Sequence, residues 1–406
     1  MDLFERTKSF TIAKEAMAAG FYPYFLPFTD SEGSVATFNG RKVIMLGSNN
    51  YLGLTTHPKV RAAAKDAIDR FGTSCTGSRF LNGTLELHLE LERRLAKFVG
   101  KEAALVFPTG YQTNLGAVSA LLERGDYAIL DKRAHACVVD GVMMTKAELK
   151  RFNHNDVKSL ESVLAKIPDS AGKLVVIDGV YSMDGDVAPL PEIIEVCRRY
   201  EARLLIDDAH GIGMMGAGRG TAAHFGLTNE ADLIMGTFSK SFASVGGFLA
   251  GSADIIHYIQ HHARSLIFSA ALPAANTATV LAALDIIENE PEHVQRLWDN
   301  TEYMRAGLKR LGYDTGTSTT PIIPLIIGDD VRMALAWRAL VDNGVYTNPV
   351  VPPGVPQSLL RTSYIATHTF DQLETALQVL EVVGENMDLI PTKAEREAAL
   401  AVSATN

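Results

Sequence analysis

The stretch "MGTFSKSFASVGGFLAG" (residues 235–251) places one lysine, Lys240, between two serines in an apolar and glycine-rich segment. Lysine is among the residues least often buried, so a lysine held here is paired, reaches solvent or serves as a nucleophile. A desolvated lysine has a lowered pKa and becomes an amine that can form a Schiff base. The hydroxyl groups of Thr237 and Ser239, which lie beside it in the sequence, could hold a phosphate.

A second stretch, "LLIDDAHGIG" (204–213), ends an apolar run with Asp207 and carries His210 shortly after it. A buried carboxylate is costly unless it is paired, and Asp207 could pair with a protonated heteroaromatic nitrogen. His210 could donate a hydrogen bond to a phenolic oxygen on the same ring. The alternative is a capping aspartate beside a histidine that is satisfied within the core. Together, Asp207 and Lys240 indicate pyridoxal 5'-phosphate (PLP), which binds through a lysine Schiff base and an acidic partner of its pyridine nitrogen.

Two further stretches could complete such a site. "AALVFPTGYQTN" (103–114) places Gly110 and Tyr111 at a strand-to-helix turn, where backbone N–H groups bind phosphate well. "LDKRAHACV" (130–138) offers His135, whose imidazole could stack on a flat cofactor ring and act on substrate protons. Taken alone, each stretch has an ordinary explanation, namely a plain turn and a solvated loop histidine.

The elements that must position these residues alternate between short apolar runs and helical patterns. The apolar runs predicted to be strands are residues 103–107, 127–131, 173–178, 202–208 and 232–236. Strands that alternate with helices predict an α/β fold with a mainly parallel sheet covered on both faces. Ligands of such sheets bind beyond the carboxyl ends of the strands, which is where the candidate residues fall.

The pattern of apolar and polar residues divides the chain into three parts. Residues 1–55 form an N-terminal segment with a hairpin turn at Asn39-Gly40, residues 56–285 a large PLP-binding domain, and residues 286–406 a smaller C-terminal α+β domain. A glycine-rich run, "GIGMMGAGRG" (211–220), follows a predicted strand, but it lacks the G-x-G-x-x-G spacing that opens a nicotinamide-binding helix.

Bulk properties exclude several classes of protein. The 406 residues carry a formal net charge of −9, which argues against broad nucleic-acid binding. The three cysteines are far apart, so neither a disulfide framework nor a metal site is expected, and a reducing cytoplasm fits best. No signal peptide or apolar run of about 18 residues is present in the sequence. The aromatic cluster "FYPYFLPF" (21–28) could touch the inner face of a membrane or pack on the protein or a partner subunit.

Long ordered motifs in this chain resemble a known family, the α-oxoamine synthases. The motifs are "GSNNYLGL", "GSRFLNGT", "DGVYSMDGD", "IDDAHGIGMMGAGRG" and "GTFSKSFASVGGFLAG". The resemblance runs from about residue 20 to residue 385 and implies a PLP-dependent transferase of the aspartate-aminotransferase-like fold (fold type I).

The resemblance implies a role for each matching residue. Lys240 would form the Schiff base, Asp207 would pair with the pyridine nitrogen, His210 would contact the phenolic oxygen, and His135 would stack on the ring. The phosphate would be surrounded by groups at Gly110, Tyr111, Thr237 and Ser239. Ser269 and Ala270, in "IFSAALP", match a segment that the opposite subunit supplies, which implies a homodimer with a shared active site.

Two residues match positions that contact the substrate. Arg361, in "SLLRTS", would grip the carboxylate of the amino acid, and Asn50 would lie near the substrate. Some family members carry a further arginine about a dozen residues earlier, but this region reads "NPVVPPGVPQS", so carboxylate handling would rely on Arg361.

The resemblance is greatest to the family branch that condenses L-serine with a long-chain acyl-CoA and releases CO2. Two alternatives remain. One is a relative that uses glycine or alanine and a different acyl thioester, and the other is a catalytically silent subunit of the same fold. Silent subunits lack the lysine, whereas Lys240 is present here.

Overall fold

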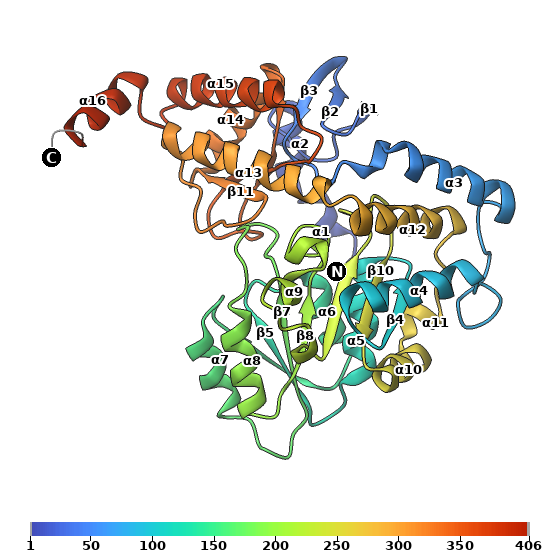
Figure 1. Ribbon diagram of the computed structural model, residues 1–406. Coiled ribbons are helices and arrows are strands. Elements are labelled where there is room, and N and C mark those ends of the chain that lie inside the picture. The colour runs from blue at the N-terminus through green and yellow to red at the C-terminus, as the bar shows by residue number, and fades with distance from the viewer. Residues whose placement is uncertain (1, 404–406) are drawn as a thin grey trace. The chain divides into compact units, whose positions relative to one another are not determined.

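The computed structural model describes residues 2–403, with side chains described up to residue 398, and it divides into two compact units (Figure 1). The larger unit comprises residues 49–298 and 319–321. The smaller unit comprises residues 2–48, 299–318 and 322–403.

A seven-stranded sheet forms the centre of the larger unit, with the strand order β4-β10-β9-β8-β7-β5-β6. Six strands run parallel, and β10 runs antiparallel between β4 and β9, which confirms the predicted, mainly parallel α/β sheet. The strands are β4 (Ala103–Phe107), β5 (Tyr127–Asp131), β6 (Glu148–Phe152), β7 (Lys173–Asp178), β8 (Arg203–Asp207), β9 (Leu233–Thr237) and β10 (Gly247–Gly251). All five predicted strands are present, and β6 and β10 were not among the predictions.

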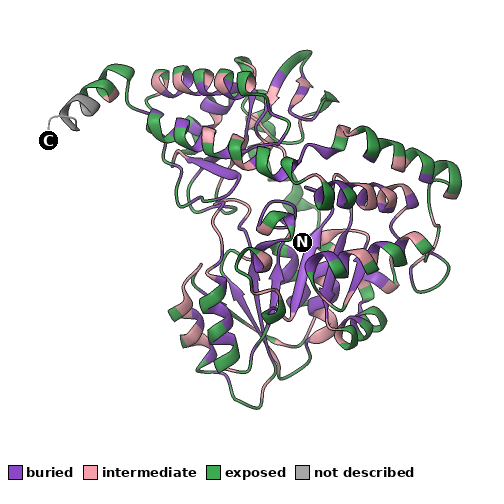
Figure 2. Cartoon of the chain, viewed as in Figure 1, coloured by how far each residue is buried: buried purple, intermediate pink, exposed green. Residues whose placement is uncertain are grey.

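Helices cover both faces of this sheet. Side chains alternate between the two faces along each strand, so those on either face are buried. On β7, Leu174 and Val176 pack against α5, α6 and α10, whereas Val175 and Ile177 pack against α7 and α8. Figure 2 shows the strands as almost wholly buried. The helices of this unit are α3 (Pro58–Phe71), α4 (Glu86–Val99), α5 (Gly110–Leu121), α6 (Ala136–Met143), α7 (Val157–Leu164), α8 (Leu190–Arg199), α9 (Thr221–His224), α10 (Ala253–His262), α11 (Arg264–Ile267) and α12 (Ala274–Asn289), with short 3-10 turns at Leu54–Thr56, Gly216–Gly218 and Thr228–Glu230.

The smaller unit contains two sheets. One has the order β1-β2-β3-β12, with β1 (Phe28–Ser31), β2 (Val35–Phe38), β3 (Arg41–Met45) and β12 (Val345–Tyr346). The other has the order β11-β14-β13, with β11 (Ile322–Ile326), β13 (Asn348–Val350) and β14 (Leu359–Ser363). The predicted hairpin turn is confirmed, since Phe38 pairs with Arg41 and both Asn39 and Gly40 have positive φ. The helices are α1 (Glu5–Lys8), α2 (Ile12–Ala18), α14 (Asp330–Asp342), α15 (Phe370–Asn386) and α16 (Lys393–Ser403).

The boundaries between the two units differ from the domain boundaries that the sequence pattern suggested. The chain passes between units after residues 48 and 298, and not after residues 55 and 285, and α13 (Glu292–Leu311) contains the second boundary. The first 48 residues belong with the C-terminal residues because β3 pairs in parallel with β12. Such a pairing joins segments about 300 residues apart, so local sequence patterns carry no sign of it.

Candidate active site

The candidate cofactor residues of the larger unit gather at one edge of the seven-stranded sheet. Strands β4, β5, β7, β8 and β9 are parallel, so their carboxyl ends lie at the same edge. Gly110 and Tyr111 follow β4, His135 follows β5, Asp207 ends β8, and Lys240 follows β9. The fold therefore brings together residues that lie up to 130 positions apart in the sequence.

The start of α5 and the end of β9 bring together groups that could hold a phosphate. Thr109 caps this helix by accepting a hydrogen bond from the Gln112 N–H, which leaves the first N–H groups of the helix directed outward. A Cβ on Gly110 would stand 2.7 Å from Oγ1 of Thr237, so the close approach of these two positions requires glycine. The Thr237 hydroxyl lies 3.0 Å from that of Ser239 and donates to the carbonyl of Gly246. Backbone N–H donors suit the phosphate of PLP, and the two hydroxyls could donate to it after turning away from their bonds to each other and to Gly246.

Asp207 is an acidic group fixed from two sides. Its side chain is only 4% exposed. Oδ1 accepts a hydrogen bond from the Ala209 N–H at 3.1 Å, and Oδ2 accepts one from Nδ2 of Asn114 at 2.6 Å. Asn114 lies fully buried on α5, and its amide nitrogen also lies 3.2 Å from Sγ of Cys137. These two donors fix the orientation of the carboxyl group, which could pair with a protonated ring nitrogen.

His135 is held as the N-cap of α6. Its Nδ1 accepts a hydrogen bond from the Cys137 N–H at 3.3 Å and lies 2.9 Å from the thiol of the same residue. Because Nδ1 accepts, a neutral imidazole carries its proton on Nε2, which remains able to donate. The ring of Tyr111 meets the His135 ring edge-on, with centroids 6.4 Å apart. The cap thus fixes the plane of a ring that could stack on a cofactor.

The remaining predicted residues of this unit take up distinct positions. Nδ1 of His210 is hydrogen-bonded to the hydroxyl of Tyr51 at 2.8 Å, and both side chains are buried. Asn50, also buried, donates to Oγ1 of Thr55. Lys240 is half-buried, and its positive charge acts on the carboxyl group of Asp178, which places the ammonium within electrostatic reach of the end of β7.

Ser269 and Ala270 were expected to reach the site from an opposite subunit. Within the single chain, Oγ of Ser269 accepts a hydrogen bond from Nε2 of Gln112, in the first turn of α5, and Ala270 is exposed. The supply of this segment by a partner stays a prediction. Arg361 lies on β14 of the smaller unit and is only 3% exposed. Its proposed contact with the substrate likewise stays a prediction.

Sequence reasoning missed three residues that shape the site, namely Asn114, Tyr51 and Asp178. Asp178 ends β7 directly beside Asp207, its partner in the parallel ladder. Burial and then the charge of Asp207 raise the pKa of Asp178 well above its usual value. The motifs "GSNNYLGL" and "DGVYSMDGD" contained Tyr51 and Asp178, whereas Asn114 gave no signal beyond being a polar residue in a helix.

Among the described residues, two groups of histidines and acids have ligand atoms close enough for a metal ion, but charged partners already engage both groups. In the first group, His154 lies with both ring nitrogens against carboxylates, of Asp131 at 3.0 Å and Asp186 at 2.9 Å. Burial alone would lower the pKa of His154, but these hydrogen bonds raise it to about 9, so the ring is an imidazolium and not a ligand. In the second group, Lys59 pairs with Glu290, and Arg296 donates to His293.

No helix in the described part of the chain is both long and apolar enough to cross a membrane.

Comparison with known proteins places the chain in a family. A family model described as aminotransferase class I and II matches residues 41–380. A serine palmitoyltransferase from Sphingobacterium spiritivorum is 47% identical over 379 residues, which cover 93% of this chain and 95% of that protein. An 8-amino-7-oxononanoate synthase from Alkaliphilus metalliredigens is 41% identical over 356 residues, which cover 87% and 90%.

A solved structure shows the same likeness in three dimensions. This is a serine palmitoyltransferase variant from S. paucimobilis with bound PLP–myriocin aldimine, and it matches with a TM-score of 0.93 at 37% identity, covering 96% of this chain and all of that one. The likeness confirms the predicted aspartate-aminotransferase-like fold. On the extent of these matches, the chain belongs to the aminotransferase class I and II family.

Proposed function

We propose that this protein is a PLP-dependent serine palmitoyltransferase. It would condense L-serine with a long-chain acyl-CoA such as palmitoyl-CoA, giving 3-ketodihydrosphingosine, CoA and CO2, the first step of sphingolipid biosynthesis. The observation that supports this proposal is that Lys240, Asp207 and His135 follow or end parallel strands and so lie, with the start of α5, at one edge of the sheet. Similarity to relatives of that name at 47% identity supports the choice of substrates.

The residues at this edge have the chemistry that the reaction needs. When bound, PLP supplies an electron sink for negative charge at Cα of the amino acid. Lys240 would hold the cofactor covalently, and its released amine would then accept the Cα proton. Asp207, oriented by its two N–H donors, would pair with the pyridine nitrogen and keep it protonated. His210 would donate to the phenolic oxygen, with its ring oriented by Tyr51.

Binding of the substrates would use the other predicted residues. The N–H groups at Gly110 and Tyr111 and the hydroxyls of Thr237 and Ser239 would hold the phosphate. His135 would cover the ring, and its Nε2–H would stabilise negative charge on the thioester carbonyl. Arg361 would bind the serine carboxylate, and Asn50 would line the substrate side.

The assembly and location that we propose are a cytoplasmic homodimer in which Ser269 and Ala270 complete the partner's site. In the single chain the aromatic N-terminal region is open, with Phe25 95% exposed and Phe4 69% exposed. We expect a second subunit to cover it, with weak peripheral contact to a membrane as the alternative. Light scattering would give the mass of the particle. Sedimentation with anionic lipid vesicles, before and after deletion of residues 1–28, would detect lipid binding.

A matrix assay tests the proposed activity. Purified protein loaded with PLP is given serine, glycine or alanine, each with acyl-CoA chains of several lengths, and released CoA is measured. We expect turnover with serine and a chain near palmitoyl to exceed every other combination. Faster turnover with glycine or alanine and a short chain would assign the protein to another α-oxoamine synthase activity. If no combination of amino acid and acyl-CoA led to release of CoA, the protein would be a silent subunit.

A further inference from the structure

Two buried carboxyl groups lie side by side at the candidate active site. Asp178 and Asp207 end the adjacent strands β7 and β8 and are paired in register. Two positions earlier on the same strands, Val176 and Leu205 face α5 and α6, so both carboxyl groups point to that face. Both are buried, at 6% and 4% exposure. Neighbouring strands lie about 4.8 Å apart, and two like charges at that spacing cannot both be ionised cheaply away from water.

The hydrogen bonds around the two carboxyl groups are unequal. Asp207 accepts from Asn114 at 2.6 Å and from the Ala209 N–H at 3.1 Å. Among the described residues, Asp178 accepts a single long bond, from the His135 N–H at 3.4 Å. Donors to a carboxylate favour its ionised form. Of the two carboxyl groups, Asp207 therefore has the donors that a negative charge needs, and Asp178 has fewer.

Asn114 provides the decisive donor. It is fully buried in the middle of α5, and its Nδ2 faces two acceptors, the carboxylate of Asp207 and the thiol sulfur of Cys137. If the amide were turned over, its carbonyl oxygen would lie against the carboxylate oxygen at the same short distance, which is repulsive. In the orientation that the structure has, the amide donates to the carboxyl group of Asp207, which suits a negative charge at that position.

We propose that Asn114 is a positioning residue that localises the negative charge of the pair on Asp207 and leaves Asp178 as a neutral carboxylic acid. The inference rests on the proposed function, in which Asp207 must stay ionised to keep the pyridine nitrogen protonated. Burial, followed by the charge of Asp207, raises the pKa of Asp178, which agrees with a neutral acid there. The other charged groups that act on Asp178 are Asp131, which reinforces this shift, and Lys240, which opposes it.

The protonation of Asp178 can be tested without any substrate. Infrared spectra of the PLP-loaded wild type and of Asp178→Asn are compared at neutral pH. We expect the difference to show the loss of a protonated carboxylic acid band, because an amide replaces the neutral acid. Asp126→Asn, at the opposite edge of the sheet, is the matched control and should lose an ionised carboxylate band. Loss of an ionised band in Asp178→Asn would overturn the proposal, and this outcome does not depend on which amino acid is the substrate.

The role of Asn114 is tested by a double-mutant cycle on kcat. Asn114→Leu has a similar size but no donor, and we expect it to lower kcat about 10- to 100-fold, as expected for loss of a hydrogen bond to a charged group. KM for the amino acid should change less than about 3-fold, because Asn114 acts through Asp207 and not on the substrate. Asp178→Asn alone should lower kcat less than about 3-fold.

The discriminating measurement is Asn114→Leu in the Asp178→Asn background. There the charge has no second carboxyl group to move to, so we expect most of the lost kcat to return. A role of Asn114 in packing alone predicts the same loss in both backgrounds, and that result would overturn the proposal. Asn114→Ala serves as a second variant if the leucine is not accommodated, with circular dichroism confirming the fold of each protein.

Discussion

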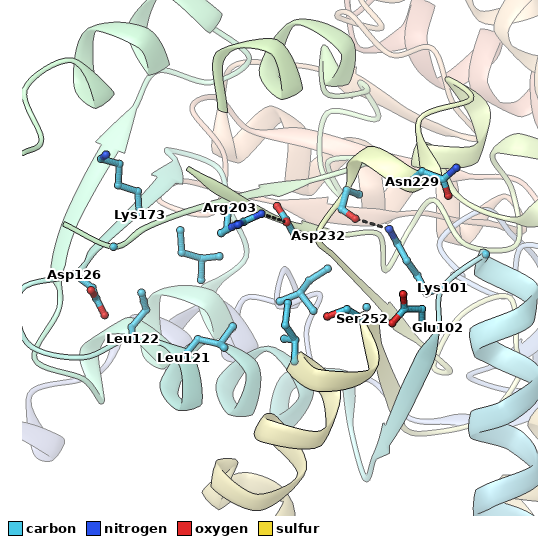
Figure 3. Close-up of a pocket in the computed structure, with 17 residues that line it drawn as sticks. Lys101, Glu102, Leu121, Leu122, Asp126, Lys173, Arg203, Asn229, Asp232 and Ser252 are labelled. Carbon is cyan, nitrogen blue, oxygen red and sulfur yellow. Dashed lines mark hydrogen bonds and ion pairs between the residues drawn. The ribbon is translucent and has the colours of Figure 1, made fainter. Parts of the chain in front are cut away.

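The central sheet has a carboxyl edge, where its parallel strands end, and an amino edge, where they begin. Both edges contain charged and polar side chains, but the two sets have different partners. At the amino edge, a cavity of about 670 Å³ is lined by Lys101, Asp126, Arg203 and Asp232 among others (Figure 3). There the charged groups are engaged by the fold itself: Figure 3 shows Arg203 directed at Asp232, and Lys101 donates to backbone carbonyl oxygens. At the carboxyl edge, the helix start at Gly110 and the carboxyl group of Asp207 belong to the proposed cofactor site. The size of a cavity is therefore a poorer guide to chemistry than the direction of its polar groups.

The largest expected effect at the carboxyl edge is that of Lys240→Ala. Turnover should fall on the order of 10³-fold or more, because the amine that holds the cofactor and accepts the Cα proton is lost. The visible absorption of the lysine-bound cofactor should disappear while the circular dichroism spectrum is retained. Lys132→Ala, an exposed lysine that follows β5 at the same edge, is the control and should keep both. Retention of full activity in Lys240→Ala would refute the proposed mechanism.

Asp207→Asn should have the next largest effect. The variant removes the charge without changing the shape, so PLP should still bind, but the pyridine nitrogen would no longer be held protonated. We expect kcat to fall about 10²- to 10³-fold, the range for losing one group that stabilises charge in a transition state. Steady-state kinetics together with cofactor titration separate the two effects. A variant that loses cofactor binding but not kcat when saturated would contradict this role.

Sequence patterns predicted the strands that the candidate residues follow, whereas the roles of these residues stay predictions. Lys240, Asp207, His210 and His135 each follow an apolar run, and parallel strands necessarily bring such positions to one edge. Asn114 was not predictable, because its bond to Asp207 joins residues 93 positions apart through a helix face. The neutral neighbour Asp178 depends on the register of β7 and β8, which no local pattern encodes. The unit boundary at residue 48 was missed for the same reason, since it depends on the pairing of β3 with β12.

At the carboxyl edge, the opposite face of the sheet has a buried carboxylate that is paired with a cationic side chain. Asp131 ends β5 and is fully buried, and His154 bridges it to Asp186. His154→Leu should destabilise the protein by about 3–5 kcal/mol, because it leaves a buried carboxylate without its counter-ion. Urea unfolding measures the change, and His257→Leu, an exposed histidine, is the control. A loss below about 1 kcal/mol would show that the ion pair contributes little.

The pH dependence of stability sharpens this prediction. The folded pKa of His154, about 9, is above the usual value near 6.5. The folded protein therefore binds the proton more tightly than the unfolded chain. The contribution of His154 to stability should be complete below about pH 6.5 and should disappear as the pH rises toward 9. The stability difference between wild type and His154→Leu should accordingly shrink over this range, and a difference that stays constant would contradict the assignment of His154 as an imidazolium.

The smallest expected effect belongs to the amino edge and completes the comparison. Lys101 donates to the carbonyl oxygens of Thr228 and Ala231. These two hydrogen bonds connect the segment before β4 to the segment before β9. Lys101→Met keeps the length of the side chain but removes the donor, so we expect a loss of about 1–2 kcal/mol in unfolding free energy. Because the proposed reaction uses no residue of this edge, kcat and KM should stay within about 2-fold of wild type. Arg203→Gln, whose side chain is 77% exposed, should change stability by less than about 1 kcal/mol. A fall in kcat in either variant would show that the two edges are coupled, and the cavity would then have to be considered as part of the functional site.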